Sequence, residues 1–366
     1  MAMDIEKVEE GVVPRTEYNN KAPPSSEEKA QKKSSINWLL LLLNFTLTAI
    51  GTIGGPLLLR LYFLHGGGRK WLTSWLQTAG FPFLILPLSI LYIRERARGT
   101  HTHFLAEPKL LISSAAIGLL LGLDNFLYSY GVSLLPVSTS SLLFSTQLAF
   151  TAFFALIIVR QKFSPFSINA VVLMTLGSVL LGIRKSGDRP ANVTNGEYLL
   201  GFVITLGAAA LLGFVLPCIE MTYAKASRAI SFTVVMQFQL GVTFFATLFC
   251  TIGMIINKDF TAIGREASAY GLGETKYYMV LTAIAILFQM VFVGSLGIVF
   301  CTSSLFAGVV AATLLPITEI AAVIVYHEKF TGEKGMALAL CLWGFTSYFY
   351  GAYRTEKKQT PQTESD

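Results

Sequence analysis

Charged side chains are scarce in this chain of 366 residues. Asp, Glu, Lys and Arg make up 14% of it, and hydrophobic residues make up 53%. Soluble domains average about 25% charged residues, so this composition excludes an ordinary soluble protein. Apolar stretches near twenty residues recur along most of the chain, and as helices each would cross the roughly 30 Å hydrocarbon core of a bilayer. The sequence therefore predicts an integral membrane protein with several spans and the lipid bilayer as its surroundings.

Cysteine is also rare, and the sequence contains none of the common catalytic motifs. The four cysteines fall inside apolar stretches, and their spacing is typical neither of a disulfide framework nor of a metal site. No HExxH motif, GxSxG motif or carboxylate pair at catalytic spacing occurs. The glycine-rich run at 66–70 resembles a phosphate-binding loop, but no strand precedes it. We therefore expect no enzyme, no metal and no bound cofactor.

Basic residues give the chain a net charge of +6, but they flank the apolar stretches and form no continuous patch. Nucleic acid is therefore not an expected partner. Residues 1–36 are polar and rich in Lys, Glu, Ser and Pro, and residues 355–366 are similar, so both are predicted to be disordered tails. No cleavable signal peptide is expected.

Ten apolar stretches are predicted to be transmembrane helices, so the expected fold class is an all-α integral membrane protein. They cover residues 37–64, 72–93, 109–131, 136–159, 166–183, 197–223, 230–256, 277–298, 302–326 and 335–353. An even number places both tails on one side of the membrane, and a bias of Lys and Arg towards that side favours cytosolic tails. This topology places the glycosylation sequon at Asn192 outside.

The two halves of the chain share short segments at matching positions. Residues 138–142 read STSSL, for example, and residues 301–305 read CTSSL. Residues 37–183 and 197–354, joined by a loop at 184–196, are therefore predicted to be two five-helix repeats. Because five is odd, the second repeat enters the bilayer from the opposite side, and the repeats are inverted. Secondary transporters with inverted repeats hold their substrate near the midplane, between the repeats.

Two carboxylates stand in the middle of predicted helices, where an unpaired charge costs on the order of 3 kcal/mol. They are Asp124 and Glu319. One interpretation is that they only hydrogen-bond to neighbouring helices. The repeat register favours a functional role, since Leu287 occupies the position in the second half that Asp124 occupies in the first. A carboxylate in apolar surroundings can exchange a proton near neutral pH, so Asp124 and Glu319 are the candidates for proton coupling.

Amide and aromatic side chains within the apolar stretches fit a base-shaped ligand. An amide presents a donor beside an acceptor, which matches one edge of adenine, and aromatic faces stack on bases. The predicted substrate-binding residues are Asn125, Gln147, Gln77, Gln237, Tyr128, Trp75 and Phe126, around a central cavity lined by predicted helices one to four and six to nine. For each amide alone, hydrogen bonding between helices is the alternative, and for each aromatic residue it is packing against lipid.

Long segments of the chain resemble the plant purine permeases of the drug/metabolite transporter superfamily. They include GLDNFLYSYGVSLLPVSTSSLL at 122–143 and CTSSLFAGVVAATLLPITEIAAVIVYHEKF at 301–330, and the resemblance extends over roughly residues 37 to 354. It implies a ten-helix fold of two inverted five-helix repeats. It also implies proton-coupled import of purine nucleobases and adenine-derived compounds such as cytokinins, at the plasma membrane or, less often, at an internal membrane.

Two other functions remain open on the sequence. A nucleotide-sugar or other metabolite exchanger of the same superfamily would need Lys or Arg beside the phosphates, and Arg60 is the one basic residue arguably inside a predicted span. A membrane receptor that binds cytokinin without moving it would have no use for an inverted repeat. Transport of a small molecule is therefore the favoured function, and no feature of the sequence indicates an oligomeric state.

Overall fold

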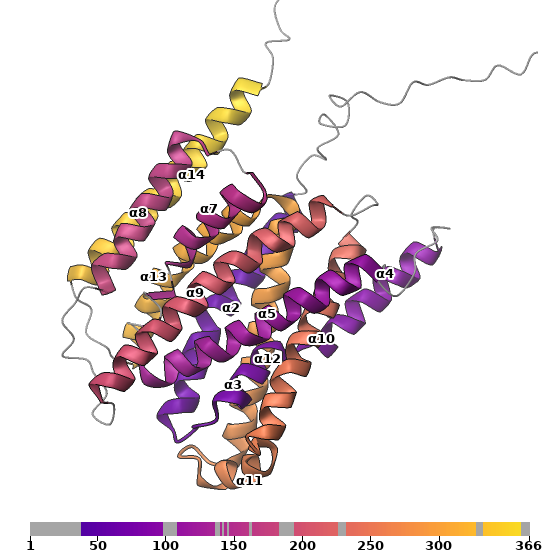
Figure 1. Cartoon of the computed structure of the whole chain (residues 1–366), viewed down its shortest axis with the longest axis vertical. Helices are drawn as coiled ribbons and strands as arrows, with labels where there is room; N and C mark the ends of the chain where they lie inside the picture. The colour runs from indigo at the N-terminus through magenta and orange to yellow at the C-terminus, as the bar shows by residue number, and fades with distance from the viewer. Residues whose placement is uncertain are drawn as a thin grey trace, which may run out of the picture. The chain divides into compact units, whose positions relative to one another are not determined.

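The protein folds into packed helices (Figure 1). The computed structural model describes residues 38–97, 108–135, 140, 143–144, 146–160, 163–182, 194–225, 232–326 and 332–359. The helices are α2 (Trp38–Leu64), α3 (Lys70–Ala79), η1 (Phe81–Leu84), α4 (Ile85–Ala97), α5 (Pro108–Leu134), α7 (Gln147–Ile158), α8 (Pro165–Gly182), α9 (Asn195–Ala224), α10 (Phe232–Ile256), α11 (Asp259–Ala269), α12 (Glu274–Cys301), α13 (Ser304–Tyr326) and α14 (Gly332–Gln359). Within those residues all regular secondary structure is helical, which confirms the predicted all-α class.

Each of the ten predicted stretches coincides with helical structure. Six segments of the described chain are long and apolar enough to cross a membrane: Trp38–Leu64, Lys70–Arg94, Pro108–Leu134, Asn195–Ala224, Thr233–Ile256 and Glu274–Cys301. Shorter apolar helices cover Gln147–Ile158, Pro165–Gly177 and Ser304–Leu314. Large apolar side chains such as Trp38, Ile256 and Trp343 point outward and are at least 70% exposed, as lipid-facing residues would be. The chain is therefore a multi-pass membrane protein.

Three local features depart from the predictions. The last helix, α14, continues to Gln359 and so includes the first residues of the predicted disordered tail at 355–366. The second stretch is divided into α3, η1 and α4, with Pro82 in the 3₁₀ turn between them; proline lacks the N–H that a continuous helix requires at that point. The segment between the stretches that end at 256 and begin at 277 contains a further helix, α11. It follows α10 directly, through a turn in which Lys258 has a φ of 56°.

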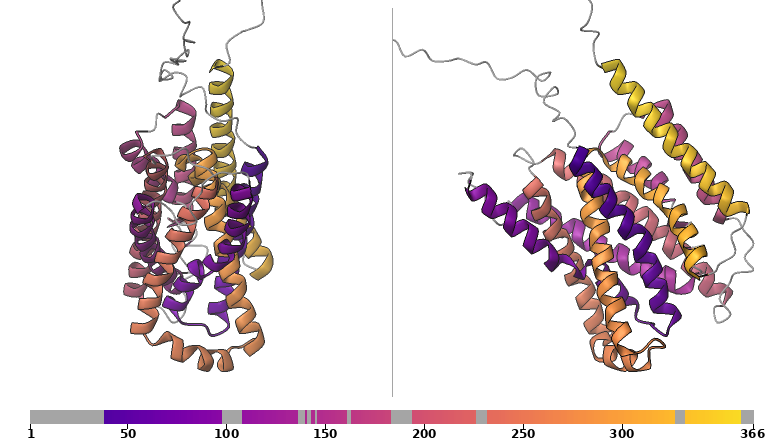
Figure 2. Two further views of the ribbon diagram at one scale, coloured as in Figure 1. Left: turned by 90° about the vertical axis from the view of Figure 1, so that its right-hand side faces the viewer. Right: turned by 180° about the vertical axis from the view of Figure 1, so that it is seen from behind.

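Helices from the two halves of the chain pack against each other. Helices α2, α5 and α8 of the first half pack on helices of the second half. Helix α2 packs on α12, α5 packs on both α9 and α10, and α8 pairs with α14. Figure 1 shows the α8 and α14 pair side by side, and Figure 2 shows α11 at the end of the helices where α10 and α12 meet. Each half therefore contributes walls to the same interior.

The two halves approach closely at the contact of α2 with α12, where glycines stand in place of larger residues. A Cβ atom on Gly51 would lie 2.4 Å from the carbonyl oxygen of Leu287, and one on Gly294 would lie 2.3 Å from Oγ1 of Thr48. Small residues let transmembrane helices approach closely enough for extensive van der Waals packing. This contact fixes the spacing of two helices that line the central cavity.

Candidate functional site

A cavity of about 120 Å³ lies between the two halves of the chain. Its walls come from α2, α5, α7, α9, α10, α12 and α13, and they are predominantly apolar, with polar groups supplied by Thr52, Tyr128, Gln147 and Ser295. The sequence predicted walls from helices one to four and six to nine. Seven of those eight contribute, while α3, in the second stretch, adds no side chain to the described wall.

Gln147 and Tyr128 are the predicted ligand-binding residues that line this cavity. Gln147 is the first residue of α7 and is 5% exposed. The Tyr128 ring lies beside that of Phe144, with 4.8 Å between their centroids and 56° between their planes. Together these residues offer one amide, with its adjacent donor and acceptor, next to an aromatic wall. Such a site suits a flat heterocycle with polar atoms on its edge.

A proline in α2 frees a backbone carbonyl at the cavity wall. Pro56 has no N–H to donate to the carbonyl oxygen of Thr52, one turn earlier in the helix. Thr318 on α13 offers a hydroxyl donor that is shared between two carbonyl oxygens, because its Oγ1 lies 3.3 Å from the Thr52 oxygen and 3.0 Å from that of Leu314. Thr52 and Pro56 both line the cavity. An interhelical hydrogen bond thus satisfies a broken turn at the site, as the apolar surroundings require.

Asp124 lies next to the cavity wall and is 2% exposed. On α5 it stands between Leu121 and Tyr128, both of which line the cavity, and is three and four residues from them. Residues at that spacing share a helix face. Its Oδ1 has no hydrogen-bond partner among the described residues. A buried polar atom without a partner is unusual in a folded protein, so Asp124 stays a candidate for ligand or proton binding.

Asn125 lies at the contact of α5 with α3. Its Nδ2 is buried and has no partner in the described part of the chain. Its backbone oxygen accepts a hydrogen bond from Oγ of Ser74 at 3.3 Å and one from Nε2 of Gln77 at 3.5 Å. Gln77 also donates to Oγ of Ser129 at 2.8 Å. The Gln77 amide therefore connects α3 with α5 in this structure and lies outside the described cavity wall.

The remaining predicted residues lie elsewhere. Trp75 donates from Nε1 to Oγ1 of Thr251 on α10 at 3.0 Å, and Phe126 stacks on Trp71 with 3.8 Å between ring centroids. Gln237 is half-buried on α10. The side chain of Glu319 lies outside the described residues, although its backbone belongs to α13. The structure thus brings Gln147 and Tyr128 together at the cavity and places Trp75 and Phe126 around α3.

Other wall residues carry little signal in the sequence. Phe144, Thr52 and Ser295 line the cavity, but an aromatic ring or a hydroxyl within an apolar helix is too common to indicate a site. Gln289 on α12, which lies outside the described cavity wall, has a stronger signal, because it is an amide in an apolar stretch. Both of its side-chain polar atoms are buried without a partner among the described residues.

Comparisons with known proteins find similar sequences over most of the chain. A family model described as "Purine nucleobase transmembrane transport" matches residues 39–358. Purine permease 3 of Arabidopsis thaliana is 46% identical over 332 residues, which cover 89% of this chain and 95% of that protein. Purine permease 2 of the same plant is 46% identical over 339 residues, which cover 88% of this chain and 95% of that protein.

One solved crystal structure shares the fold. Its TM-score is 0.59 at 17% sequence identity, and the match covers 87% of this chain and 99% of that one. At this identity the likeness concerns the arrangement of helices alone.

Proposed function

The chain belongs to the purine permease family, whose members are transporters and not enzymes, and from this premise we propose that it imports purine nucleobases and adenine-derived compounds such as cytokinins. The import would be coupled to protons and would take place across the plasma membrane. The observation that carries the proposal is the cavity between the two halves, where Gln147 and the aromatic ring of Tyr128 share one wall.

Base recognition would centre on Gln147. Its amide can donate to one atom of a purine edge and accept from the next, while Tyr128 and Phe144 supply aromatic faces for the ring. An apolar cavity of about 150 Å³ is known to admit benzene, so the present cavity of about 120 Å³ suits a single ring. A purine has two fused rings, and its binding would require the surrounding helices to move apart.

The remaining predicted contacts would form during that movement. Asn125 would turn towards the base its Nδ2, which has no partner among the residues that the structure describes. Gln77 and Trp75 would have to exchange their present partners on α5 and α10 for the ligand. Phe126 and Gln237 would lie further from the base.

Proton coupling is assigned to Asp124, with Glu319 as the second candidate. Asp124 is buried next to the cavity wall, and its Oδ1 lacks a partner among the described residues. A carboxylate in such surroundings favours its neutral form unless a cation or donor joins it. Proton binding and release at this position would then change with the occupancy of the cavity. No other cofactor is needed for the cycle.

The proposed architecture is ten membrane spans in two inverted repeats, residues 37–183 and 197–354. It is supported by the match between the ten predicted stretches and the observed helices, and by the packing of first-half helices on second-half helices. Inverted repeats permit one half to rock against the other around a fixed site. In this account the cavity opens alternately to the two sides of the membrane.

The composition of the wall argues against a nucleotide-sugar exchanger, because the described cavity wall contains neither Lys nor Arg to neutralise phosphates. Arg60, on α2, places its guanidinium 4.9 Å from the centre of the Tyr326 ring. A receptor that binds cytokinin without moving it is separated from a transporter by one assay, the appearance of ligand inside sealed vesicles.

The proposal is tested by uptake of radiolabelled adenine into yeast that expresses the protein, with Gln147→Ala beside the wild type. Removal of one hydrogen-bonding partner leaves polar groups of the base unpaired, which costs about 1–3 kcal/mol and raises the KM about 5- to 150-fold. Phe153→Leu is the matched control, since Phe153 is on the same helix and is 56% exposed. Equal uptake by Gln147→Ala and the control would remove Gln147 from the site, and a wild type that accumulates no purine would refute the function.

A further inference from the structure

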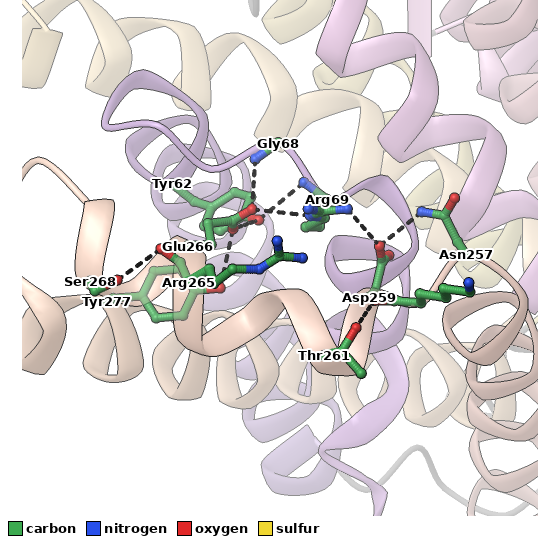
Figure 3. Close-up of polar contacts among 11 residues, drawn as sticks. Tyr62, Gly68, Arg69, Asn257, Asp259, Thr261, Arg265, Glu266, Ser268 and Tyr277 are labelled. Carbon is green, nitrogen blue, oxygen red and sulfur yellow. Dashed lines mark hydrogen bonds and ion pairs between the residues drawn. The ribbon is translucent and has the colours of Figure 1, made fainter.

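A network of charged and hydroxyl groups joins the two halves of the chain at the end that carries α11 (Figure 3). Arg69 lies in the turn between α2 and α3. Its Nη1 is 3.4 Å from Oδ1 of Asp259, and its Nε is 3.5 Å from Oε2 of Glu266. Both carboxylates belong to α11, in the second half of the chain. One arginine from the first half thus holds two acids from the second.

Glu266 has partners from both halves. Tyr62 on α2 donates its hydroxyl to Oε1, and Tyr277 on α12 donates to the same oxygen at 3.1 Å. The backbone N–H of Gly68 points at Oε2 from 3.4 Å. Tyr62 and Tyr277 are fully buried, so these hydroxyls are fixed in direction. Glu266 therefore stays hydrogen-bonded even when Arg69 leaves it.

Asp259 likewise has a partner besides Arg69. Its side chain is 0% exposed, and Nδ2 of Asn257 donates to its Oδ1 at 2.8 Å. The Arg69 side chain, by contrast, is 36% exposed, so its guanidinium can return to water without a large desolvation cost. Breaking a buried ion pair is expensive when a charge is left without partners. When the halves separate at this end, the contacts of Arg69, Tyr62 and Gly68 with the acids are lost together. Glu266 then keeps the hydroxyl of Tyr277, and Asp259 keeps the amide of Asn257, both from the acids' own half.

Backbone contacts beside the network join the same two segments. The N–H of Gly271 donates to the carbonyl oxygen of His65 at 3.0 Å, and the Tyr270 hydroxyl donates to that of Leu61 at 3.2 Å. Burial and the charge of Glu266 raise the pKa of Tyr270, so its hydroxyl remains a donor across the physiological range. With α11, these contacts connect the ends of α2 and α12, two helices that line the cavity.

We propose that Arg69, Asp259 and Glu266 form a latch that holds the α11 end of the transport route closed, and that Arg69 leaves the acids when this end opens. The proposal rests on the proposed function, because only a transporter with alternating access must separate its halves at each end in turn. The predicted topology places this end outside the cell. The latch would then be released for each substrate that enters.

A reversible crosslink beside the latch tests this directly. A Cβ atom on Gly271 would lie 3.7 Å from Cβ of His65, which is within the range of about 3.5–4.5 Å that a disulfide requires. In the double variant His65→Cys/Gly271→Cys we expect oxidation to abolish purine uptake and a reductant to restore it, while each single variant is unaffected by either reagent. Full uptake by the crosslinked protein would overturn the latch. Failure of the pair to crosslink under oxidant would refute the closed geometry itself.

A second measurement does not depend on the substrate. Ser295 lines the cavity, so Ser295→Cys reports its exposure to a membrane-impermeant thiol reagent, with the parent chain correcting for its own cysteines. We expect Arg69→Gln or Glu266→Gln to accelerate labelling from the α11 side on the order of tenfold, a usual size for such a coupling. Arg265→Gln is the matched control, since Arg265 is exposed on α11 next to Glu266.

The two proposals can fail separately. If the Arg69 and Glu266 variants label no faster than the Arg265 control while the wild type transports purine, the latch is wrong and the function stands. If labelling accelerates but no purine is ever transported, the latch stands and the proposed substrate is wrong. Surface expression of every variant is measured in parallel, and the conservative Arg69→Lys, which keeps the charge, is expected to label at a rate between those of the wild type and Arg69→Gln.

Discussion

Gly51 offers the sharpest test of how the two halves are held around the cavity. In Gly51→Ala the added Cβ would lie 2.4 Å from the carbonyl oxygen of Leu287, 2.6 Å from Cγ2 of Val291 and 2.9 Å from its backbone nitrogen. Two of these are backbone atoms, which a rotamer change cannot move. To restore a separation of about 3.5 Å, α2 and α12 must separate by roughly 1 Å.

Overpacking of this kind costs about 1–3 kcal/mol, so we expect purified Gly51→Ala to unfold several degrees below the wild type. Gly207→Ala is the matched control, because Gly207 lies in α9 with no atom within 4 Å of an added Cβ. Its substitution should be neutral or stabilise the helix by up to about 1 kcal/mol. Purine uptake by Gly51→Ala should also fall, since Thr52 and Val291 line the cavity. Equal melting temperatures for the two variants would refute the close contact of α2 with α12.

Three further predictions concern hydrogen bonds. Thr318→Val should lower the free energy of unfolding by about 1–3 kcal/mol in a thermal unfolding assay, because it removes the hydroxyl that can donate to the Thr52 carbonyl. Thr318→Ser keeps that hydroxyl and should be close to the wild type in the same assay. Thr194→Ala should cost about 1 kcal/mol, since its side chain caps the first turn of α9, and Thr194→Ser should not. Gln77→Leu should lower the melting temperature more than it raises the KM, because the amide donates to Ser129 in this structure; a large rise in KM at unchanged stability would instead make Gln77 a direct ligand contact.

Much of the fold could be predicted from hydropathy because a bilayer imposes it. A segment that crosses the hydrocarbon must be helical and apolar over about twenty residues, and the helices accordingly coincide with the predicted stretches. The helix α11 lacks this signal. It is short and carries Asp259 and Glu266, so nothing in its composition distinguishes it from a polar loop. The division of the second stretch at Pro82 was not predicted either, because proline is tolerated inside many transmembrane helices and so does not by itself indicate a break.

The candidate site was predictable only where a polar residue stands in apolar surroundings. Gln147 and Asp124 were singled out on that basis, and Tyr128 was singled out as an aromatic face, and of the three Gln147 and Tyr128 line the cavity. Composition does not determine the direction in which a side chain points from its helix, and the structure places Trp75 against α10. The latch could not be predicted, because Arg69 lies 190 residues from its partner Asp259 and only tertiary packing brings them together.

The central claim, proton-coupled purine import through the buried carboxylate of Asp124, is tested most directly by adenine uptake at about pH 5 and about pH 8, on either side of neutrality, with and without a protonophore. Asp124→Asn is compared with Leu123→Val, a control at the neighbouring position, which is 39% exposed. We predict strong uptake at the lower pH that the protonophore abolishes in the wild type and control. Asp124→Asn should reach the surface but lose concentrative uptake and its dependence on pH. Wild-type responses to pH and protonophore in Asp124→Asn would contradict the account.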